Sequence, residues 1–264
     1  MNNYFGINLE FDSNKIHQLI AKAISDNQKG YVCVVDGNVL TIAQKTQVYR
    51  TIINNSLVNT CDGSSIAWLA GKIYKKDFRA HTGPEIFTKY IESSYKQILL
   101  GSTDTVIEKI KAKLKSKGIK DDHIQHIPVP FLPVDSFNYS EIAEEINKLN
   151  PDIIWVSLGA PKQEIFMSKI LPFIDKGVMF GIGAAFNFYI AEIAIPRKRR
   201  GALQFIWLNR IFHEPKKQLK RSVPYIAILP KLAVREKIKM IEPTLKSNLK
   251  KCSIFDKIKN ENSI

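Results

Sequence analysis

Residues 153–164 have the sequence IIWVSLGAPKQE, in which an apolar run leads through a glycine into the start of a helix. The run 153–158 has the length and composition of a buried strand. Pro161 near the first helical position and Glu164 in the first turn are typical of a helix N-terminus. A strand that passes directly into a helix is the repeating unit of parallel sheets, so this stretch predicts an α/β fold.

Similar apolar runs occur along the chain and predict further strands. They are residues 31–35, 39–42, 97–100 and 178–182. Between them, residues 104–117 place apolar side chains on one helical face, with Asp104 as the expected N-cap and Gly118 as the stop. A second helix is expected over residues 140–150, and the proline-rich segment 126–133 is expected to be a loop. The alternation of strands and helices predicts a largely parallel sheet.

The chain has 264 residues, enough for one large domain or for one domain with an appendage. Its net charge of +14 is concentrated at one end, because residues 197–264 hold 18 of the 39 Lys and Arg but only 5 of the 25 Asp and Glu. We therefore divide the chain into a nearly neutral core, residues 1–196, and a basic appendage, residues 197–264. Such an appendage implies an anionic partner, and composition leaves open whether this is nucleic acid, a nucleotide or a membrane surface.

Within the appendage, residues 223–234 are mostly apolar and are followed by the basic segment 235–239. Two interpretations fit this pattern. The segment lies at a lipid interface with its cations near anionic headgroups, or it is a basic helix packed on the core with its charges in water. No run reaches the roughly 18 to 20 apolar residues that a spanning helix needs, so any contact with a membrane is expected to be peripheral.

The sequence lacks the patterns of several other classes of protein. Cys33, Cys61 and Cys252 have unrelated spacings that indicate neither a disulfide framework nor a zinc site, so we expect the reducing cytosol. Residues 1–16 carry two acids and no continuous apolar run, unlike a signal peptide. The histidines show no metal-ligand spacing, and no phosphate-binding loop, nucleophile elbow or dinucleotide fingerprint occurs. We therefore expect neither a metal nor a cofactor.

Ligands of parallel α/β sheets bind beyond the carboxyl ends of the strands, where polar residues and glycines that follow an apolar run are candidates. Asp62 lies at an expected strand-to-helix turn, where it can act as a general base or cap the helix. Lys162 and Gln163 lie at a helix N-terminus, which suits either a phosphate or sugar hydroxyl or plain capping. The glycines of residues 181–186 allow close approach of a ligand to the backbone, and residues 101–103 are a fourth candidate.

Six segments of the chain form an ordered set of motifs. They are Leu40-Thr41, Asp62-Gly63, RAHTGPEIF at 79–87, GAPKQE at 159–164, GIGAAFNF at 181–188 and WLNRIFHEPKKQLKR at 207–221. In this order they resemble the WecG/TagA/CpsF glycosyltransferase family. The resemblance implies a Rossmann-like core with a basic helical C-terminal appendage that meets the membrane. It also implies an inverting, metal-independent transfer of a sugar from a UDP-sugar to an undecaprenyl-diphosphate-linked acceptor, at the cytoplasmic face of the membrane, in the synthesis of teichoic acid, capsule or other surface polysaccharide.

The resemblance also assigns roles to individual residues. Asp62 would deprotonate the acceptor hydroxyl, and Arg221 would neutralise the diphosphate leaving group. The other substrate-binding residues that the motifs imply are Thr41, Arg79, Gln163, Glu164, Gly181, Gly183 and Asn187, with the two glycines admitting the nucleotide to the backbone. An inverting transfer needs a base on one side of the anomeric carbon and charge stabilisation on the other, which agrees with this division of roles.

The chain departs from the family's usual pattern at several positions. Ala43 stands where Asn is usual, Asn187 stands where Asp is usual, and Ala191, Ile206 and residues 195–197 also differ. These differences bear on the sugar, which stays open among N-acetylmannosamine, its uronic acid, glucose and another hexose. Two rival functions stay open as well: a nucleic-acid-binding α/β protein whose basic tail tracks phosphates, and a family member that binds UDP-sugar or lipid without turnover. We favour the transferase over nucleic-acid binding and leave self-association open.

Overall fold

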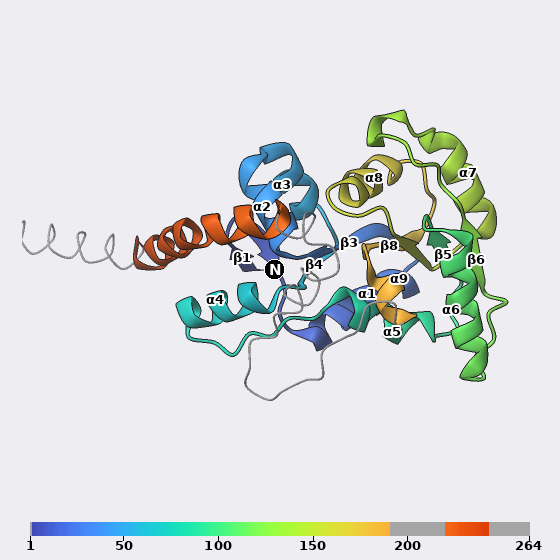
Figure 1. Cartoon of the computed structure of the whole chain (residues 1–264), viewed down its shortest axis with the longest axis horizontal. Helices are drawn as coiled ribbons and strands as arrows, with labels where there is room; N and C mark the ends of the chain where they lie inside the picture. The colour runs from blue at the N-terminus through green and yellow to red at the C-terminus, as the bar shows by residue number, and fades with distance from the viewer. Residues whose placement is uncertain (1, 191–219, 243–264) are drawn as a thin grey trace, which may run out of the picture.

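The computed structural model describes residues 2–190 and 220–242, which fold around one parallel sheet (Figure 1). Six strands lie in the order β4-β3-β8-β7-β5-β6, and every neighbouring pair is parallel. The strands are β3 (Lys29–Val35), β4 (Val58–Cys61), β5 (Gln97–Leu100), β6 (Ile124–Ile127), β7 (Ile153–Val156) and β8 (Gly177–Gly181). A parallel sheet whose strands are connected by helices is an α/β fold, so the predicted fold class is confirmed. The central strands are buried on both faces, which explains their near-continuous apolar sequences.

Helices cover both faces of the sheet and form two cores. One face carries α2 (Gly37–Lys45), α3 (Gln47–Asn54), α4 (Ser64–Tyr74), α7 (Tyr139–Leu149) and α8 (Lys162–Ile170). The other carries α1 (Ser13–Ser25), α5 (Gly83–Ile91), α6 (Asp104–Ser116) and α9 (Ala185–Tyr189). Side chains alternate between the cores, as in β7, where Ile154 and Val156 face the first and Ile153 and Trp155 the second. This doubly wound arrangement is Rossmann-like, as expected.

Four of the five predicted strands are confirmed, as are both predicted helices, although the N-cap of α6 is Thr103 rather than Asp104. The prediction of a strand over residues 39–42 is wrong, because these residues lie in α2. Asp36 directly follows β3, and its Oδ1 accepts a hydrogen bond from the Val39 N–H at 2.8 Å. This cap starts the helix immediately after the strand, so the apolar residues that follow turn onto a helical face.

The two edge strands have polar sequences that hid them from prediction. β6, with the sequence IQHI, takes in two residues of the predicted loop 126–133, so the loop begins at Pro128. β4, with the sequence VNTC, contains Asn59, which is fully buried. The Asn59 amide donates to the carbonyl oxygens of Asn8 (2.8 Å) and Ile53 (2.9 Å), which satisfies this polar group inside the fold.

A short antiparallel hairpin lies beside β4, and its strands are β1 (Asn2–Tyr4) and β2 (Ile7–Leu9). The turn residues Phe5 and Gly6 both have positive φ, 55° and 77°, as a two-residue hairpin turn requires. The Phe5 side chain is buried, and the Glu10 N–H donates to the carbonyl oxygen of Asn59 at 2.9 Å. The hairpin is therefore part of the body of the protein.

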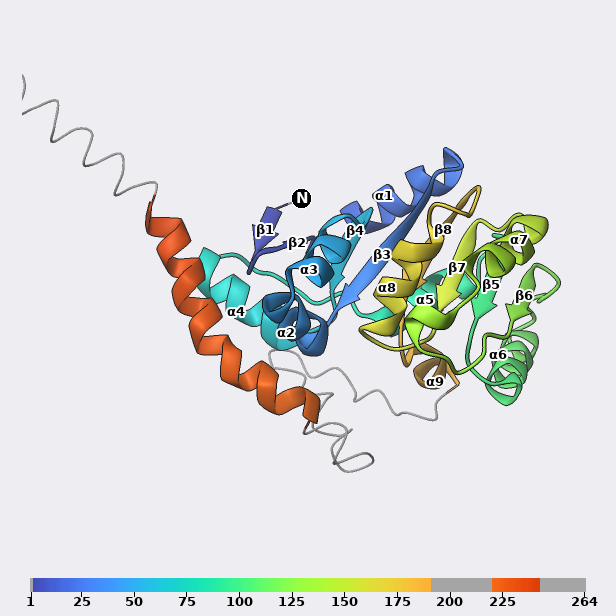
Figure 2. The same cartoon turned by 90° about the horizontal axis from the view of Figure 1, so that it is seen from above.

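A helix over residues 220–242 confirms the helical character predicted for the appendage. It runs beside α2, α4 and the β1–β2 hairpin at one end of the molecule (Figure 2). Tyr225, Leu232 and Glu236 are its buried residues, and their spacing places them on one side of the helix. The helix continues through Pro230, so its packing on the core outweighs the backbone hydrogen bond that a proline removes.

Several predictions fall on other parts of the chain. The expected boundary at residue 196, the differing positions 191, 195–197 and 206, residues 207–219 of the last motif and Cys252 lie outside the described residues. Cys33 and Cys61 are buried free thiols. Within residues 2–190 and 220–242, no helix combines the length and apolar character that crossing a membrane requires.

Candidate active site

The candidate segments meet at the carboxyl edge of the sheet, because parallel strands all end on the same side. The residues that follow the adjacent strands β4, β3, β8 and β7 are, in that order, Asp62, Asp36, Ile182 and Ser157. Segments 159–164 and 181–188, predicted from sequence, continue from two of these positions. The fold therefore brings three of the predicted motifs to one edge.

Asp62 lies between the end of β3 and the N-terminus of α5. Its N–H donates to the carbonyl oxygen of Val35 at 2.9 Å, and its Oδ1 accepts a hydrogen bond from the Gly83 N–H at 2.9 Å. Gly83 is the first residue of α5, so the carboxylate faces the positive end of that helix, which favours its ionised form. The capping alternative holds in part: Asp62 satisfies the N-terminus of α5, whereas α4, which follows it, has Gly63 as its N-cap.

The N-terminus of α5 is itself firmly held. Thr82 Oγ1 accepts from the Glu85 N–H at 3.4 Å, and Glu85 Oε2 accepts from the Thr82 N–H at 2.9 Å, which forms a capping box. The His81 N–H donates to the carbonyl oxygen of Cys61 at 2.8 Å and ties the segment to the end of β4. Asp62 thus binds a turn whose backbone is fixed from both sides.

Two histidines lie next to this turn. Nε2 of His81 is 3.1 Å from Nε2 of His17, and Nδ1 of His17 is 3.0 Å from the Tyr90 hydroxyl. Burial, assisted by the charges of Lys89 and His81, lowers the pKa of His17 to about 4. His17 is therefore a neutral hydrogen-bonding group at neutral pH. Sequence reasoning missed the pair because the fold alone joins two residues from distant segments.

Gln163 joins the loops that follow β7 and β8. Its Oε1 accepts hydrogen bonds from the Gly159 N–H (3.1 Å) and the Gly183 N–H (3.0 Å). Its Nε2 donates to Glu164 Oε1 at 2.8 Å, and the residue is only 3% exposed. These contacts engage both ends of the amide with the protein, so Gln163 positions the two glycine loops.

Glu164 is fully buried beside Gln163. The Tyr49 hydroxyl donates to its Oε2 at 2.9 Å. Burial raises the pKa of Glu164 to about 7, against the hydrogen bonds from Gln163 and Tyr49, which lower it. None of its surface is accessible, so Glu164 has no face open to a ligand, and its hydrogen bond helps to hold the Gln163 side chain in place.

Gly181 and Gly183, the two glycines predicted to bind the nucleotide, lie in different surroundings. A Cβ at Gly181 would lie 2.7 Å from Met167 Cε and 3.1 Å from Gln163 Nε2, so a side chain there would require both of these side chains to shift. Gly183 has a φ of +54°, and a Cβ there would meet only Gln163 Oε1, at 3.8 Å. The Gly183 carbonyl oxygen accepts a hydrogen bond from Ser157 Oγ at 2.8 Å. Of the two, Gly183 is the one whose surroundings leave room for a ligand.

The remaining predicted substrate-binding residues have varied surroundings. Thr41 is buried inside α2, and its hydroxyl donates to the carbonyl oxygen of Gly37 at 2.6 Å. Arg79 lies between α4 and α5, where its side chain is 83% exposed and pairs with Asp77 at 3.1 Å. Asn187 is partly exposed in α9, which follows the loop after β8. The side chains of Thr41 and Arg79 are thus engaged with their own neighbours rather than with the other predicted site residues.

The C-terminal helix adds Tyr225 to this edge. Its hydroxyl is 2.7 Å from Ser65 Oγ in the first turn of α4. Its ring packs on the first residue of α2, Gly37, where a Cβ would lie 2.7 Å from a ring carbon. Tyr225 therefore spans the starts of the two helices that follow β3 and β4. Arg221 lies one turn earlier on the same side of the helix.

Asp36 is a second carboxylate of the edge, and sequence reasoning missed it. The rule that selects Asp62, a polar residue directly after an apolar strand, also selects Asp36. Asp36 was not considered, because the predicted strand over residues 39–42 left no strand-to-helix turn directly after residues 31–35. Tyr225 had no comparable signal, since its partners lie far away in the chain. Among the residues that the structure describes, no three His, Cys, Asp or Glu side chains gather as metal ligands do.

The sequence matches the model of a known protein family. A family model described as glycosyl transferase WecG/TagA/CpsF family matches residues 3–242. Two relatives are both named N-acetylglucosaminyldiphosphoundecaprenol N-acetyl-beta-D-mannosaminyltransferase. The Bacillus subtilis protein is 21% identical over 195 residues, 70% of this chain and 72% of its own, and the Bacillus spizizenii protein is 20% identical over 205 residues, 73% and 74% respectively. This chain therefore belongs to the WecG/TagA/CpsF family and is a glycosyltransferase.

Proposed function

We propose that this enzyme transfers an N-acetylmannosamine-type sugar, or another hexose, from a UDP-sugar to an acceptor linked to undecaprenyl diphosphate. The transfer inverts the anomeric carbon and needs no metal. The names of the two relatives, which specify an N-acetylmannosaminyl group and a diphosphoundecaprenol acceptor, support the substrate classes. The observation that carries the proposal is Asp62, whose carboxylate lies at the carboxyl edge of the sheet and is held by the Gly83 N–H at 2.9 Å.

In the proposed step, the oxygen of the acceptor hydroxyl attacks the anomeric carbon of the donor sugar, and Asp62 accepts the proton of that hydroxyl. The bond between that carbon and the UDP oxygen breaks on the opposite face. A positioned general base typically contributes a factor of about 10² to 10⁴. The hydrogen bond from Gly83 fixes the direction of the carboxylate before substrate arrives, and α5 favours the ionised form that a base requires.

The departing UDP carries negative charge that the protein must stabilise. We assign this role to Arg221, with Lys162 in the first turn of α8 as a second cation. The N–H groups of Gln163 and Ile165 in that turn already donate to the carbonyl oxygens of Gly159 and Pro161. Gln163 holds the two glycine loops in place, and the open surroundings of Gly183 let the nucleotide approach the backbone. Asn187, in the helix that follows this loop, would contact the donor.

We also propose that the enzyme works peripherally on the inner face of the cytoplasmic membrane, where a lipid-linked acceptor would lie. The outward side of the C-terminal helix carries exposed apolar residues, with Lys231 among them. They are Val223 (59% exposed), Ile226 (51%), Val234 (58%) and Ile238 (59%). Exposed apolar side chains beside cations suit an anionic lipid surface. The helix thus fits both earlier interpretations, with one side on the core and the other available to lipid.

Release of UDP from a panel of UDP-sugars, with and without a short-chain lipid-diphosphate-sugar acceptor, tests the proposal. We expect acceptor-dependent release from one donor, and a fall in kcat of about a hundredfold or more in Asp62→Asn. Asp122→Asn is the matched control and should keep the wild-type rate. Its side chain is 79% exposed and precedes β6, at the opposite edge of the sheet.

Other outcomes would correct the proposal in defined ways. Activity that survives in Asp62→Asn but disappears in Asp36→Asn would make Asp36 the base. Release from no donor, with UDP failing to raise the Tm, would refute the use of UDP-sugars, whereas UDP binding without release would indicate a non-catalytic family member. The anomeric configuration of the product, read by NMR, tests inversion, and EDTA should leave the rate unchanged.

Nucleic-acid binding is the rival explanation for the basic appendage. Competition binding separates the transferase from a nucleic-acid-binding protein. A transferase should prefer UDP and anionic vesicles, whereas a nucleic-acid-binding protein should prefer oligonucleotides and bind them with a steep dependence on salt. Membership of the glycosyltransferase family supports the first result. Self-association stays open, and light scattering of the purified protein would measure it.

A further inference from the structure

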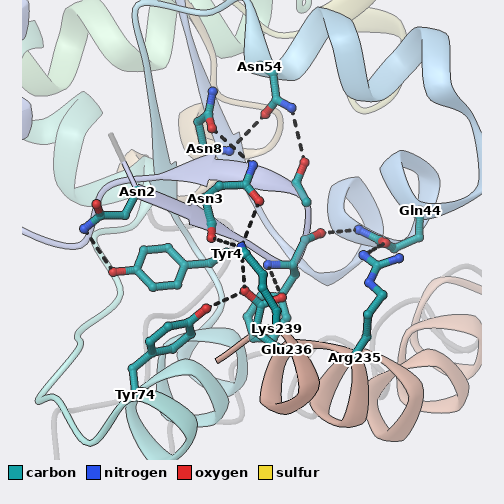
Figure 3. A network of polar contacts seen from close by, with 12 residues as sticks. Asn2, Asn3, Tyr4, Asn8, Gln44, Asn54, Tyr74, Arg235, Glu236 and Lys239 are labelled. Carbon is teal, nitrogen blue, oxygen red and sulfur yellow. Dashed lines mark hydrogen bonds and ion pairs between the residues drawn. The ribbon is translucent and has the colours of Figure 1, made fainter. Parts of the chain in front are cut away.

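We propose that the C-terminal helix is held over the carboxyl edge of the sheet by a latch near its other end, and that Glu236, at the centre of this latch, is a positioning residue for sugar transfer. The latch is the set of contacts that Glu236, Arg235 and Lys239 make with the β1–β2 hairpin, α2 and α4 (Figure 3). The attachment of the helix is independent of function, and only the effect on transfer rests on the proposed function.

Glu236 is a buried carboxylate, 1% exposed, at the junction between the helix and the hairpin. Its Oε2 accepts a hydrogen bond from the Phe5 N–H at 3.1 Å. Its Oε1 accepts one from the Tyr74 hydroxyl at 2.5 Å and pairs with Lys239 Nζ at 3.2 Å. A buried carboxylate is strongly unfavourable unless such donors surround it. Since two of these donors belong to the hairpin and to α4, the arrangement exists only while the helix is docked.

Neighbouring residues strengthen the same junction. Lys239 Nζ donates to the carbonyl oxygen of Asn3 at 2.7 Å, and an Arg235 guanidinium N–H donates to Gln44 Oε1 at 2.8 Å. Gln44 in turn donates from Nε2 to the carbonyl oxygen of Phe5 at 2.7 Å. The backbone of Phe5 is therefore bound at both its N–H and its carbonyl group. Figure 3 shows Arg235 directed toward Gln44, and Glu236 and Lys239 directed toward the hairpin.

The latch complements a second attachment at the active-site edge. Tyr225 meets Ser65 in the first turn of α4, and Glu236 meets Tyr74, the last residue of α4. The two helices lie side by side (Figure 2) and are tied at both ends of α4, about 16 Å apart along the C-terminal helix. Between the two ties, Leu232 is buried and Ile228 and Leu229 pack against the core. The contacts of Glu236 add a polar tie at the far end, which limits rotation of the helix about Tyr225 and so helps to fix where Arg221 lies.

Pro230 makes the second tie more important. It lies between the two attachment points and removes one backbone hydrogen bond from the helix. The segment on either side of a mid-helix proline is more easily bent than an uninterrupted helix. A contact on each side of Pro230 therefore holds both halves, and loss of the Glu236 contacts would loosen the half that follows Pro230 and, through the continuous helix, the position of Tyr225 and Arg221.

Hydrogen exchange and transfer kinetics on the full-length protein test the latch together, well below the unfolding temperature. In Glu236→Ala we expect exchange of residues 225–240 and of the hairpin to become at least tenfold faster, with β7 unchanged. We expect kcat to fall at least tenfold with the KM for the donor little changed. Glu236→Gln should lie between Glu236→Ala and the wild type in both hydrogen exchange and kcat, because the amide oxygen of the glutamine can still accept one hydrogen bond. Glu108→Ala, which removes an exposed carboxylate from α6, away from the C-terminal helix, should match the wild type.

The possible results separate the parts of the proposal. Unchanged exchange of residues 225–240 in Glu236→Ala would refute the latch, even if no donor supports transfer by the wild type. Faster exchange with wild-type kcat would refute the positioning role while leaving the latch and the transferase intact. If Glu236→Ala fails to fold, Tyr74→Phe removes only the hydroxyl that reaches Glu236, and it should raise exchange of the helix and lower kcat at least threefold. A Tyr74→Phe variant that matches the wild type in both would also overturn the proposal.

Discussion

The buried carboxyl group of Glu164 predicts a specific dependence of stability on pH. Burial raises its pKa from 4.5 to about 7, against the opposing hydrogen bonds from Gln163 and Tyr49. The folded protein therefore keeps the proton up to about pH 7, whereas the unfolded chain releases it near pH 4.5. Because the folded state binds more protons in this interval, the stability that this group contributes is complete below pH 4.5 and is lost as the pH rises through 7.

The size of the loss follows from the two pKa values. A rise from 4.5 to about 7 corresponds to about 3 kcal/mol, at roughly 1.4 kcal/mol for each pH unit, and about 2 to 3 kcal/mol of this falls between pH 5 and pH 8. Glu164→Gln removes the titrating group, while its amide oxygen can still accept the hydrogen bond from Tyr49. The free energy of unfolding of the variant should therefore gain about 2 to 3 kcal/mol relative to the wild type between pH 5 and pH 8.

Urea denaturation at a series of pH values, followed by tryptophan fluorescence, measures this difference, since Trp155 is fully buried in the sheet. Glu108→Gln is the control, because this carboxylate lies on the exposed side of α6 and its removal should preserve the wild-type profile. If the profiles of the wild type and Glu164→Gln run parallel to within about 0.5 kcal/mol, the reasoning that burial retains the proton is refuted.

Three further substitutions test individual packing and hydrogen-bond contacts. Gly181→Ala places a methyl group 2.7 Å from Met167 Cε and should reduce the free energy of unfolding by about 1 to 3 kcal/mol, whereas an unchanged urea midpoint would mean that the Met167 side chain simply moves aside. Gly37→Ala puts a methyl group against the Tyr225 ring and should speed hydrogen exchange of the C-terminal helix, so equal exchange would count against that packing. Asn59→Ala leaves two carbonyl oxygens without their donor and should cost about 2 to 4 kcal/mol by calorimetry, and a loss below about 1 kcal/mol would show that water replaces the amide.

The fold was predictable where a strand is apolar along its whole length. β7 (Ile153–Val156) and β8 (Gly177–Gly181) lie in the middle of the sheet, where both faces are buried and the strand sequences contain no polar side chain. The same reasoning failed at residues 39–42, because a short apolar run fits either a strand or one side of a helix. Here the hydrogen bond from the Val39 N–H to Asp36 starts a helix. It also passed over β4, whose buried Asn59 is satisfied by partners that only the folded chain supplies.

The location of the site was predictable from the sequence, but the roles of its individual residues were predictable only in part. Asp62 follows a strand and reaches the edge where ligands bind, as the sequence pattern indicates. The same pattern cannot show that Gln163 directs its amide to two glycine N–H groups, because the direction of a side chain depends on loops from another part of the chain. Nor can it place Arg79, whose sequence neighbour Asp77 holds the guanidinium on the surface. The position of a residue after a strand therefore predicts the edge of the sheet where it lies, whereas its role depends on the hydrogen-bond partners that the fold supplies.

One amide oxygen of Gln163 holds both Gly159 and Gly183, so the loops after β7 and β8 behave as a single mechanical unit. A loop transplanted from another member of the family would keep its shape only if the glutamine and both glycines came with it. Shifts in donor preference during evolution are therefore expected as concerted replacements across both loops, or at side chains that leave this bridge intact. For the engineer of a new donor specificity, residues 159–163 and 181–183 form one exchangeable module.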